Sequence, residues 1–143
     1  MFMTVYQSKY VTFNIDVENS ILEAIWTDNY EIVGEIYKNE MLQARKIVEE
    51  YRPKYCLADN RNFYFRISPE LQIWVSENIF QKNGEEIIKY YAFIFPPDVL
   101  ASILLEQMME ESNRQQMTKG FATMEEAKEW LVLLAVNIAL NNE

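Results

Sequence analysis

Three polar side chains in the middle of the chain have types and spacing that could bind a ligand or partner. Asp59 and Arg61 come at the end of a short apolar segment, and Ser68 follows after an aromatic stretch. In α/β proteins, ligands and partners dock at the carboxyl ends of strands, so this group is a candidate interaction or ligand site. The competing interpretation is structural: Asp59 caps a turn, Arg61 pairs with it at the surface, and Ser68 caps a helix.

Catalytic chemistry has little support in the composition. The chain has no histidine, which removes His general bases, Ser-His-Asp and Cys-His arrangements, and almost every transition-metal site. Gly34, Gly84 and Gly120 lie far apart and form no phosphate-binding loop. Acidic pairs such as Glu110-Glu111 suit solvated helix faces. We therefore expect no catalytic residue, no cofactor and no metal ion, and we keep a carboxylate-based enzyme as a third alternative.

Charge and hydropathy narrow the class of partner and the location. Thirteen basic and 22 acidic residues give a net charge of −9, which disfavours nucleic acid and anionic membrane surfaces. The longest apolar run, Trp130 to Val136, is shorter than the roughly 20 residues of a membrane span. The first residues lack the basic and apolar regions of a signal peptide.

A single cysteine, Cys56, excludes an intrachain disulfide and is expected in the core. We expect a cytoplasmic protein without membrane insertion.

The elements that position these residues follow from periodicity and turn signals. Alternating and apolar runs predict strands at Tyr10 to Ile15, Ile21 to Trp26, Lys54 to Asp59, Ile87 to Phe95 and, as a short edge strand, Lys119 to Ala122. Helical spacing predicts helices at Tyr30 to Tyr51, Pro69 to about Phe80, Val99 to about Ser112 and Met124 to about Leu140. Asn83-Gly84 is a turn signal, and 113–118 is expected to be a loop.

The order of elements predicts the fold class. Strands that alternate with helices indicate an α/β protein with helices packed on a mixed, mostly parallel sheet of four to five strands, and the opening hairpin makes that sheet mixed. The order is β-β-α-β-α-β-α-(β)-α, with four helices. The chain of 143 residues fits one domain, 1–143, with a core at about 10–134 and a helical extension to about 140.

Four short patterns follow one another along the chain. In chain order they are Leu57-x-Asp59-x-Arg61, Pro69-Glu70-x-Gln72-x-Trp74, Ala92, and Phe121-x-x-x-Glu125-x-Ala127-x-x-Trp130-Leu131. Their order and spacing resemble those of the STAS-like domains, in particular the small stand-alone SpoIIAA-like bacterial proteins of unknown function, over about Tyr10 to Leu134. That family includes the anti-sigma-factor antagonists, so the resemblance implies a STAS fold and a regulatory, protein-binding role.

The phosphorylation switch of the antagonists does not carry over to this chain. Their Asp-Ser-Ser-Gly signature falls on Ile67-Ser68-Pro69-Glu70, so three of its four residues are replaced, including the usual phosphoacceptor at Pro69. Ser68 remains, and its role as a helix N-cap is the better interpretation.

Two helices carry more apolar residues than one buried face requires. In the helix from Val99, a sheet-facing stripe needs Leu100, Ile103 and Leu104, which leaves a candidate dimer surface at Val99, Leu105, Met108 and Met109. The last helix has a similar surplus at Val132, Leu133, Val136 and Leu140. Such surfaces indicate a partner, a homodimer in the simplest case or another protein. The alternatives are a thicker core and an apolar cavity, as in the lipid carriers of the distantly similar CRAL-TRIO type.

The sequence thus predicts a non-catalytic regulatory or protein-interaction module that forms a homodimer. The main alternative is a carrier or sensor of an apolar small molecule or lipid-like ligand, in a pocket between helices and sheet. The aromatic run Phe63-Tyr64-Phe65 is expected to close a core edge, with lining such a cleft as its alternative.

Overall fold

The computed structural model describes residues 1–27, 30–80, 86–112 and 117–141. The strands are β1 (Met3–Gln7), β2 (Val11–Asp16), β3 (Ile21–Trp26), β4 (Tyr55–Asp59), β5 (Tyr90–Ile94) and β6 (Met117–Phe121). The helices are α1 (Gly34–Tyr51), α2 (Pro69–Val75), α3 (Val99–Ser112) and α4 (Met124–Asn141), and a π-helical turn, η1 (Ser76–Phe80), extends α2. The predicted α/β class with a mixed sheet and four helices is confirmed.

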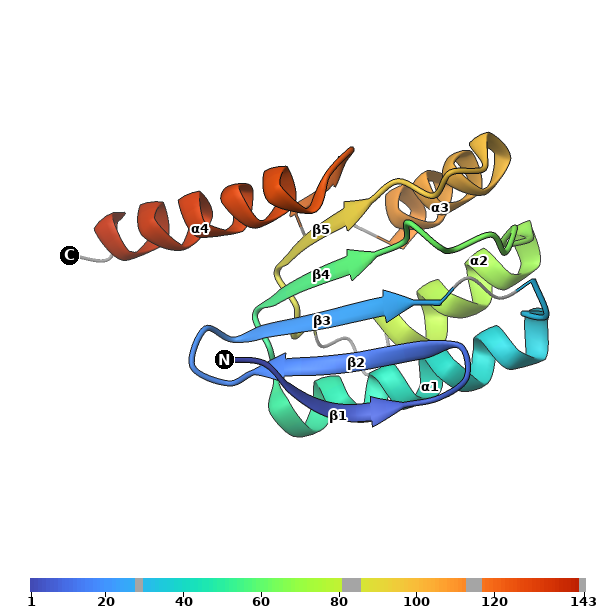
Figure 1. Ribbon diagram of the computed structural model, residues 1–143, viewed down its shortest axis with the longest axis horizontal. Coiled ribbons are helices and arrows are strands. Elements are labelled where there is room, and N and C mark those ends of the chain that lie inside the picture. The colour runs from blue at the N-terminus through green and yellow to red at the C-terminus, as the bar shows by residue number, and fades with distance from the viewer. Residues whose placement is uncertain (28–29, 81–85, 113–116, 142–143) are drawn as a thin grey trace.

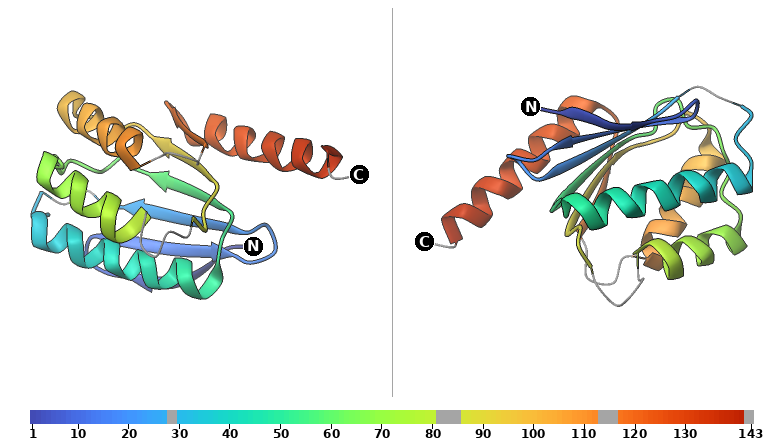
Figure 2. Two further views of the ribbon diagram at one scale, coloured as in Figure 1. Left: turned by 180° about the vertical axis from the view of Figure 1, so that it is seen from behind. Right: turned by 90° about the horizontal axis from the view of Figure 1, so that it is seen from below.

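The order of the strands in the sheet is the order of the strands in the chain. β1, β2 and β3 pair antiparallel, whereas β3 to β6 pair parallel. Crossovers between parallel strands are right-handed, so successive crossovers in one direction place their helices on one face. Figures 1 and 2 show this result: α1, α2 and α3 cover one face of the sheet, and α4 lies across the other.

The sequence misses one strand, which corrects the predicted number of four to five. β1 adds a sixth strand at the edge of the opening hairpin, where it pairs with β2. The predicted hairpin of β2 and β3 is confirmed, with Val11 opposite Trp26 and Asp16 opposite Ile21. The predicted short edge strand is also confirmed, as β6, although it begins at Met117 inside the predicted loop. The Asn83-Gly84 turn signal and positions 113–116 lie outside the described residues.

α1 begins later than predicted and ends as predicted. It starts at Gly34 after Val33, which is extended and offers no side-chain cap. It ends at Arg52, whose φ of 48° places it in the left-handed region, and whose N–H donates to the Val48 carbonyl at 2.8 Å. Pro53 then prevents further helix, as the sequence predicts.

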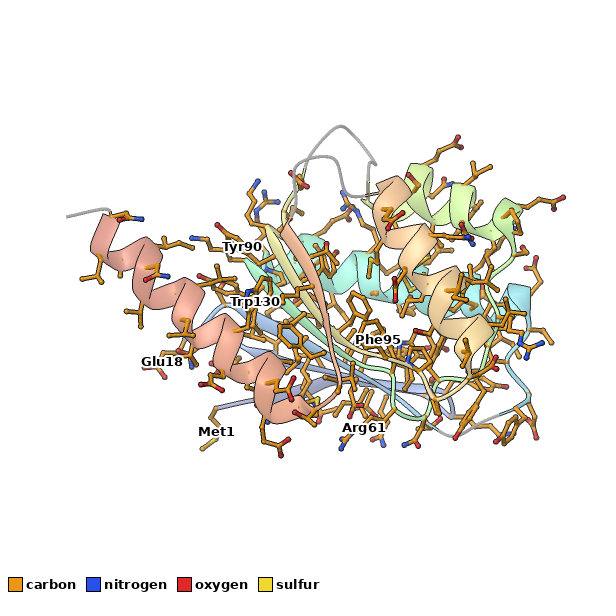
Figure 3. The ribbon with its side chains drawn as sticks, turned by 90° about the horizontal axis from the view of Figure 1, so that it is seen from above. Met1, Glu18, Arg61, Tyr90, Phe95 and Trp130 are labelled. Atoms are coloured by element: carbon orange, nitrogen blue, oxygen red, sulfur yellow. The ribbon has the colours of Figure 1, made fainter. Side chains whose placement is uncertain are left out.

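Side chains alternate across the sheet and build two separate cores. The larger core lies between the sheet and α1, α2, α3, and includes Phe13, Trp26, Tyr37, Phe63 and Met108. The smaller core lies under α4 and consists of Tyr55, Leu57, Ala92, Ile94, Phe121, Ala127 and Leu131. Trp130 and Tyr90 are half-buried at its margin (Figure 3).

α4 lies over β4, β5 and β6, and the outer face of β1, β2 and β3 carries a polar row. Thr4 Oγ1 donates to Asn14 Oδ1 at 2.7 Å, and Asn14 Nδ2 donates to Glu23 Oε1 at 2.9 Å. These hydrogen bonds pair the polar side chains of the row, including that of Glu23, which is buried at 8% exposure.

Candidate functional site

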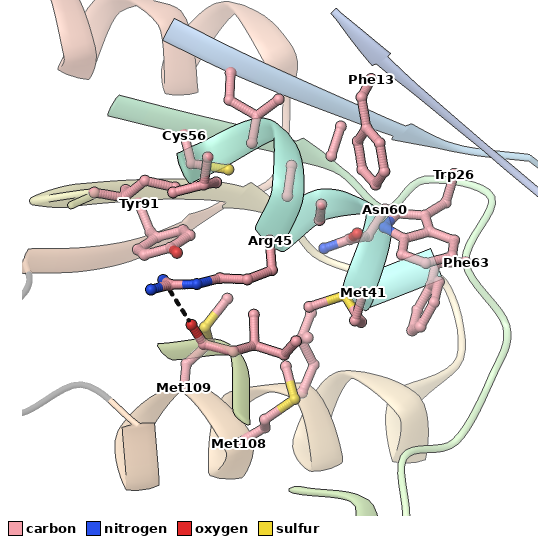
Figure 4. Close-up of a pocket in the computed structure, with 18 of the residues that line it drawn as sticks. Phe13, Trp26, Met41, Arg45, Cys56, Asn60, Phe63, Tyr91, Met108 and Met109 are labelled. Atoms are coloured by element: carbon pink, nitrogen blue, oxygen red, sulfur yellow. Dashed lines mark hydrogen bonds between the residues drawn. The ribbon is translucent and has the colours of Figure 1, made fainter. Parts of the chain in front are cut away.

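An apolar cavity of about 100 Å³ lies in the larger core, between the sheet and helices α1 and α3 (Figure 4). Its walls come from β2, β3, β4 and β5, from α1, η1 and α3, and from the segments that follow β4 and precede β5. The residues that line it are Phe13, Leu22, Ala24, Trp26, Tyr37, Met41, Ala44, Arg45, Val48, Cys56, Ala58, Asn60, Phe63, Ile79, Ile87, Ile88, Tyr91, Leu105, Met108 and Met109. We call this space the core cavity.

The core cavity exists because small side chains meet where a packed core would place large ones. Ala24 on β3 and Ala58 on β4 are paired neighbours that both face inward, and Cys56 precedes Ala58 on the same side. Ala44 on α1 faces them across the gap. Protein interiors are normally filled to crystal density, so four small side chains around one point leave a space.

Aromatic rings close one end of the core cavity. Trp26 stacks on Tyr37 with ring centroids 5.6 Å apart, and Phe63 meets Trp26 edge-on at 5.0 Å. Phe65 packs against Tyr37 at 5.4 Å, while Tyr64 stacks outside on Tyr30 at 4.7 Å. The run Phe63-Tyr64-Phe65 therefore has both roles that the sequence left open: it closes the core edge, and Phe63 lines the cavity.

Two polar groups reach the apolar walls from opposite ends (Figure 4). Arg45 on α1 is 6% exposed; its Nε donates to Glu49 Oε1 at 2.9 Å and its Nη1 donates to the Ile79 carbonyl at 3.1 Å. Asn60, directly after β4, is 3% exposed and lies beside Trp26 and Phe63. Sequence reasoning missed both, because a helical Arg and a post-strand Asn look like ordinary surface residues.

Burial keeps the Cys56 thiol and the tyrosine hydroxyls along the wall neutral. Burial raises the pKa of the Cys56 thiol to about 12, and it also raises the pKa of the Tyr91 hydroxyl well above its usual value. Tyr37 donates from its hydroxyl to the sulfur of Met108 at 3.8 Å. Cys56 is therefore a protonated core residue, as the sequence predicts, and a thiolate nucleophile is not available at neutral pH.

Asp59 and Arg61 form the pair that the sequence predicts. Arg61 Nε and Nη2 donate to Asp59 Oδ1 and Oδ2 at 2.9 and 2.7 Å, and the Arg61 backbone N–H donates to Oδ1 at 3.2 Å. Burial raises the pKa of the Asp59 carboxyl, but the hydrogen bonds from Arg61 outweigh it and hold that pKa below its usual value. Arg61 itself points to solvent (Figure 3). The geometry matches the structural interpretation, a turn cap with its own counter-ion.

Ser68 is placed as a helix cap. Its backbone is extended, its Oγ accepts from the Leu71 N–H at 3.2 Å, and Pro69 follows at the first helical position. The Ser68 hydroxyl bonds to the Leu71 N–H and the Asp59 carboxylate to Arg61, so these two side chains do not share a hydrogen-bond partner.

The proposed dimer surface on α3 is wrong for three of its four residues. Leu105, Met108 and Met109 are 4%, 1% and 9% exposed and belong to the larger core. Val99 is 73% exposed. Leu100 and Ile103, which the sequence assigned to the sheet side, are 43% and 47% exposed. The surplus on α3 is thus explained by a thicker core, and the helix faces the sheet with the opposite stripe.

The surplus on α4 is exposed, as the sequence predicts. Val132, Leu133, Val136 and Leu140 are 62%, 56%, 49% and 61% exposed, and we call them the α4 apolar face. Ala127 and Leu131 are the buried residues of the helix. Beside them lies a groove of about 330 Å³, lined by Phe2, Asn19, Ile21, Tyr55, Leu57, Lys128, Leu131, Val132 and Ala135.

Other kinds of site find little support in the described part of the chain. In residues 1–27, 30–80, 86–112 and 117–141, no three Cys, Asp or Glu side chains come together in a way that could hold a metal ion. Within those ranges no helix is long and apolar enough to cross a membrane.

The fold and site define a class, an α/β sheet protein with helices on both faces, a small apolar cavity and a bare apolar helix. No protein-family model matches the chain, and neither a curated protein nor a solved structure does. The resemblance to the STAS-like domains therefore stays a prediction.

Proposed function

We propose that the protein is a non-catalytic interaction module that forms a homodimer through the α4 apolar face. The observation that carries this proposal is the exposure of four large aliphatic side chains on one helix, each about half or more exposed. Single exposed apolar residues are normal, but a contiguous apolar surface marks an interaction site.

α4 is apolar on several sides, so more than one of its sides needs a packing partner. Between Trp130 and Leu140 the sequence has Asn137 as its one polar residue. A helix that is apolar all round is normally buried, yet the sheet covers the side of Leu131 and leaves the α4 apolar face in solvent. Figures 1 and 2 show why: the second half of α4 projects past the ends of the strands.

A second copy of the chain is the occupant that the charge distribution favours. The net charge of −9 makes two copies repel each other over most of their surface. The sequence from Trp130 to Asn142 has no charged residue, so this half of α4 can approach another copy without that repulsion. A two-fold axis then places identical apolar surfaces against each other.

The α4 apolar face alone is too small for a stable interface, so we include the groove beside α4. A stable interface buries roughly 800 Å² on each partner, which four side chains do not supply. The groove of about 330 Å³ next to Leu131 and Val132 can receive apolar side chains of the opposite helix. The dimer therefore uses the projecting half of α4 and the groove together.

The resemblance to the STAS-like domains suggests the broader role, and the single cysteine bears on the cellular location. The STAS-like pattern supports a regulatory, protein-binding function, and the single buried cysteine suits the reducing cytoplasm. Asp59, Arg61 and Ser68 act in this proposal as structural residues.

The test is the mass of the protein in solution by sedimentation equilibrium at tens of micromolar. Wild type is expected at twice the chain mass of 17.0 kDa. Leu133→Glu with Val136→Glu is expected at the chain mass with unchanged circular dichroism, because both side chains are half exposed in the monomer.

A matched control places the same change on another helix. Leu100 and Ile103 on α3 are 43% and 47% exposed, so Leu100→Glu with Ile103→Glu removes a similar apolar area. This control is expected to remain a dimer. A monomeric wild type, or a control that dissociates while the α4 variant stays paired, would overturn the proposal.

A further inference from the structure

We infer that the core cavity binds a small neutral aromatic molecule that carries one hydrogen-bonding group, of the phenol class. The inference concerns the inner face of the sheet and does not depend on the homodimer, which uses the outer face. It follows from the volume of the cavity, the nature of its walls and its two polar groups.

The volume selects a single small ring. The cavity measures about 100 Å³. A dry engineered cavity of roughly 150 Å³ lined by Leu, Ile and Phe binds benzene or xenon. A lipid chain is far too long for this space, so the lipid-like ligand considered from the sequence does not fit. Methionine side chains at Met41, Met108 and Met109 can adjust the space to a ring, because the thioether chain is flexible.

The walls select an aromatic ligand. The rings of Trp26, Tyr37 and Phe63 meet at one end, and stacked or edge-on rings attract one another beyond simple burial. The three methionines, on α1 and α3, also line the cavity, and sulfur makes favourable contacts with aromatic rings. A ring in the cavity therefore meets partners of both kinds.

The polar groups select a neutral ligand with one hydrogen-bonding group. The charge of Arg45 is matched by Glu49, and its Nη1 is held by the Ile79 carbonyl, so the cavity has no excess charge to hold an anion. The Asn60 carboxamide lies at the aromatic end and offers both donors and an acceptor. A phenolic hydroxyl can donate to its oxygen while the ring remains among the apolar walls.

The position of Asn60 makes it the specificity-determining residue. It is 3% exposed, so a hydrogen bond to it is shielded from water. A buried polar group that is left unpaired disfavours a ligand that lacks the matching group. Phenol is therefore expected to bind more tightly than benzene, and the difference is expected to depend on Asn60.

The experiment titrates the full chain with phenol and with benzene, and follows the melting temperature and the heat of binding. A ligand that binds the folded state raises the melting temperature in a saturable way. Wild type is expected to bind phenol about tenfold or more tightly than benzene. Asn60→Leu is expected to bring the two affinities within about threefold of each other.

Two variants that fill the space test the location. Ala44→Leu places a good helix former on α1 against the cavity, and Ala24→Val places a good strand former on β3. Either variant is expected to abolish binding of both probes. Ala139→Leu on the exposed surface of α4 is the matched control and is expected to bind as wild type does.

The cavity variants and the α4 variants test phenol binding and homodimer formation separately. The cavity variants are expected to keep the mass of the dimer, and the α4 variants are expected to keep phenol binding. Absence of saturable stabilisation by phenol, equal phenol binding in Ala44→Leu and Ala24→Val, or an unchanged phenol preference in Asn60→Leu would each overturn the inference. If one filling variant fails to fold, the other and Asn60→Leu still decide it.

Discussion

A buried carboxylate on α1 holds β1, the strand that the sequence misses, onto the rest of the molecule. Glu40 is 6% exposed; its Oε1 accepts from the Tyr6 hydroxyl at 3.2 Å and its Oε2 accepts from the Ser8 hydroxyl at 3.1 Å. Tyr6→Phe removes one of these donors and keeps the ring that stacks on Phe13. We expect this single change to loosen β1 and to lower the free energy of unfolding.

The magnitude follows from the type of bond. A hydrogen bond to a charged group contributes roughly 1.5–3 kcal/mol. Tyr6 is half-buried, so water replaces part of the lost bond and the expected loss is about 1–1.5 kcal/mol. For a chain of this size, that loss lowers the melting temperature by roughly 3–5 °C.

The assay is a double-mutant cycle of Tyr6→Phe and Glu40→Leu, with urea unfolding of all four proteins. If the hydroxyl acts through Glu40, Tyr6→Phe costs little once Glu40 is Leu, and the coupling energy equals most of the single loss. Equal losses in both backgrounds would refute the reasoning, because the Tyr6 hydroxyl would then act independently of the carboxylate.

Two further predictions concern the Asp59 pair and the tryptophans. Asp59 has a lowered pKa in the folded state, so its stabilisation is present above its ordinary pKa near 4 and is lost as pH falls through the lowered value. In urea unfolding, Arg61→Ala is therefore expected to be less stable than wild type at pH 7, with the gap closing toward pH 2; a constant gap would contradict this. Trp26→Ala is expected to cost about 3–5 kcal/mol because Trp26 is buried at 6% exposure. Trp130→Ala is expected to cost clearly less, since Trp130 is half-buried against Phe121, and equal melting temperatures for the two variants would contradict this.

The extent of α3 was predictable from its sequence, but the face it presents to the sheet was not. The helix is apolar on several sides, so periodicity predicts its existence at Val99 to Ser112 without setting its rotation. In the structure the buried side is that of Leu105, Met108 and Met109. At the helix start the Ala101 N–H donates to Asp98 Oδ2, and Arg66 pairs with Asp98 from another segment. Such a contact is not visible in the spacing of apolar residues.

The candidate sites show the same division between local and long-range information. The Ser68 cap and the Asp59–Arg61 pair involve residues at most three positions apart, so the sequence predicts both correctly. The core cavity depends on Ala24, Ala58 and Ala44 meeting from three elements. Small residues in strands and helices are common, and the space appears when the register of β3 and β4 brings them together.

β4 separates the two proposed surfaces, because Tyr55 and Leu57 line the groove beside α4 whereas Cys56 and Ala58 line the core cavity. Alternation along the strand places Asp59 on the outer face, where the charge of Lys128 on α4 reaches it, and places Asn60 on the inner face at the core cavity. The sequence identifies this strand end, with Asp59 and Arg61, as part of a candidate interaction or ligand site. The structure shows that the pair caps the turn that contains Asn60, through bonds from the Arg61 side chain and backbone N–H to the Asp59 carboxylate. Asp59 and Arg61 therefore support the cavity by position, and the residue between them is the one that a ligand would contact.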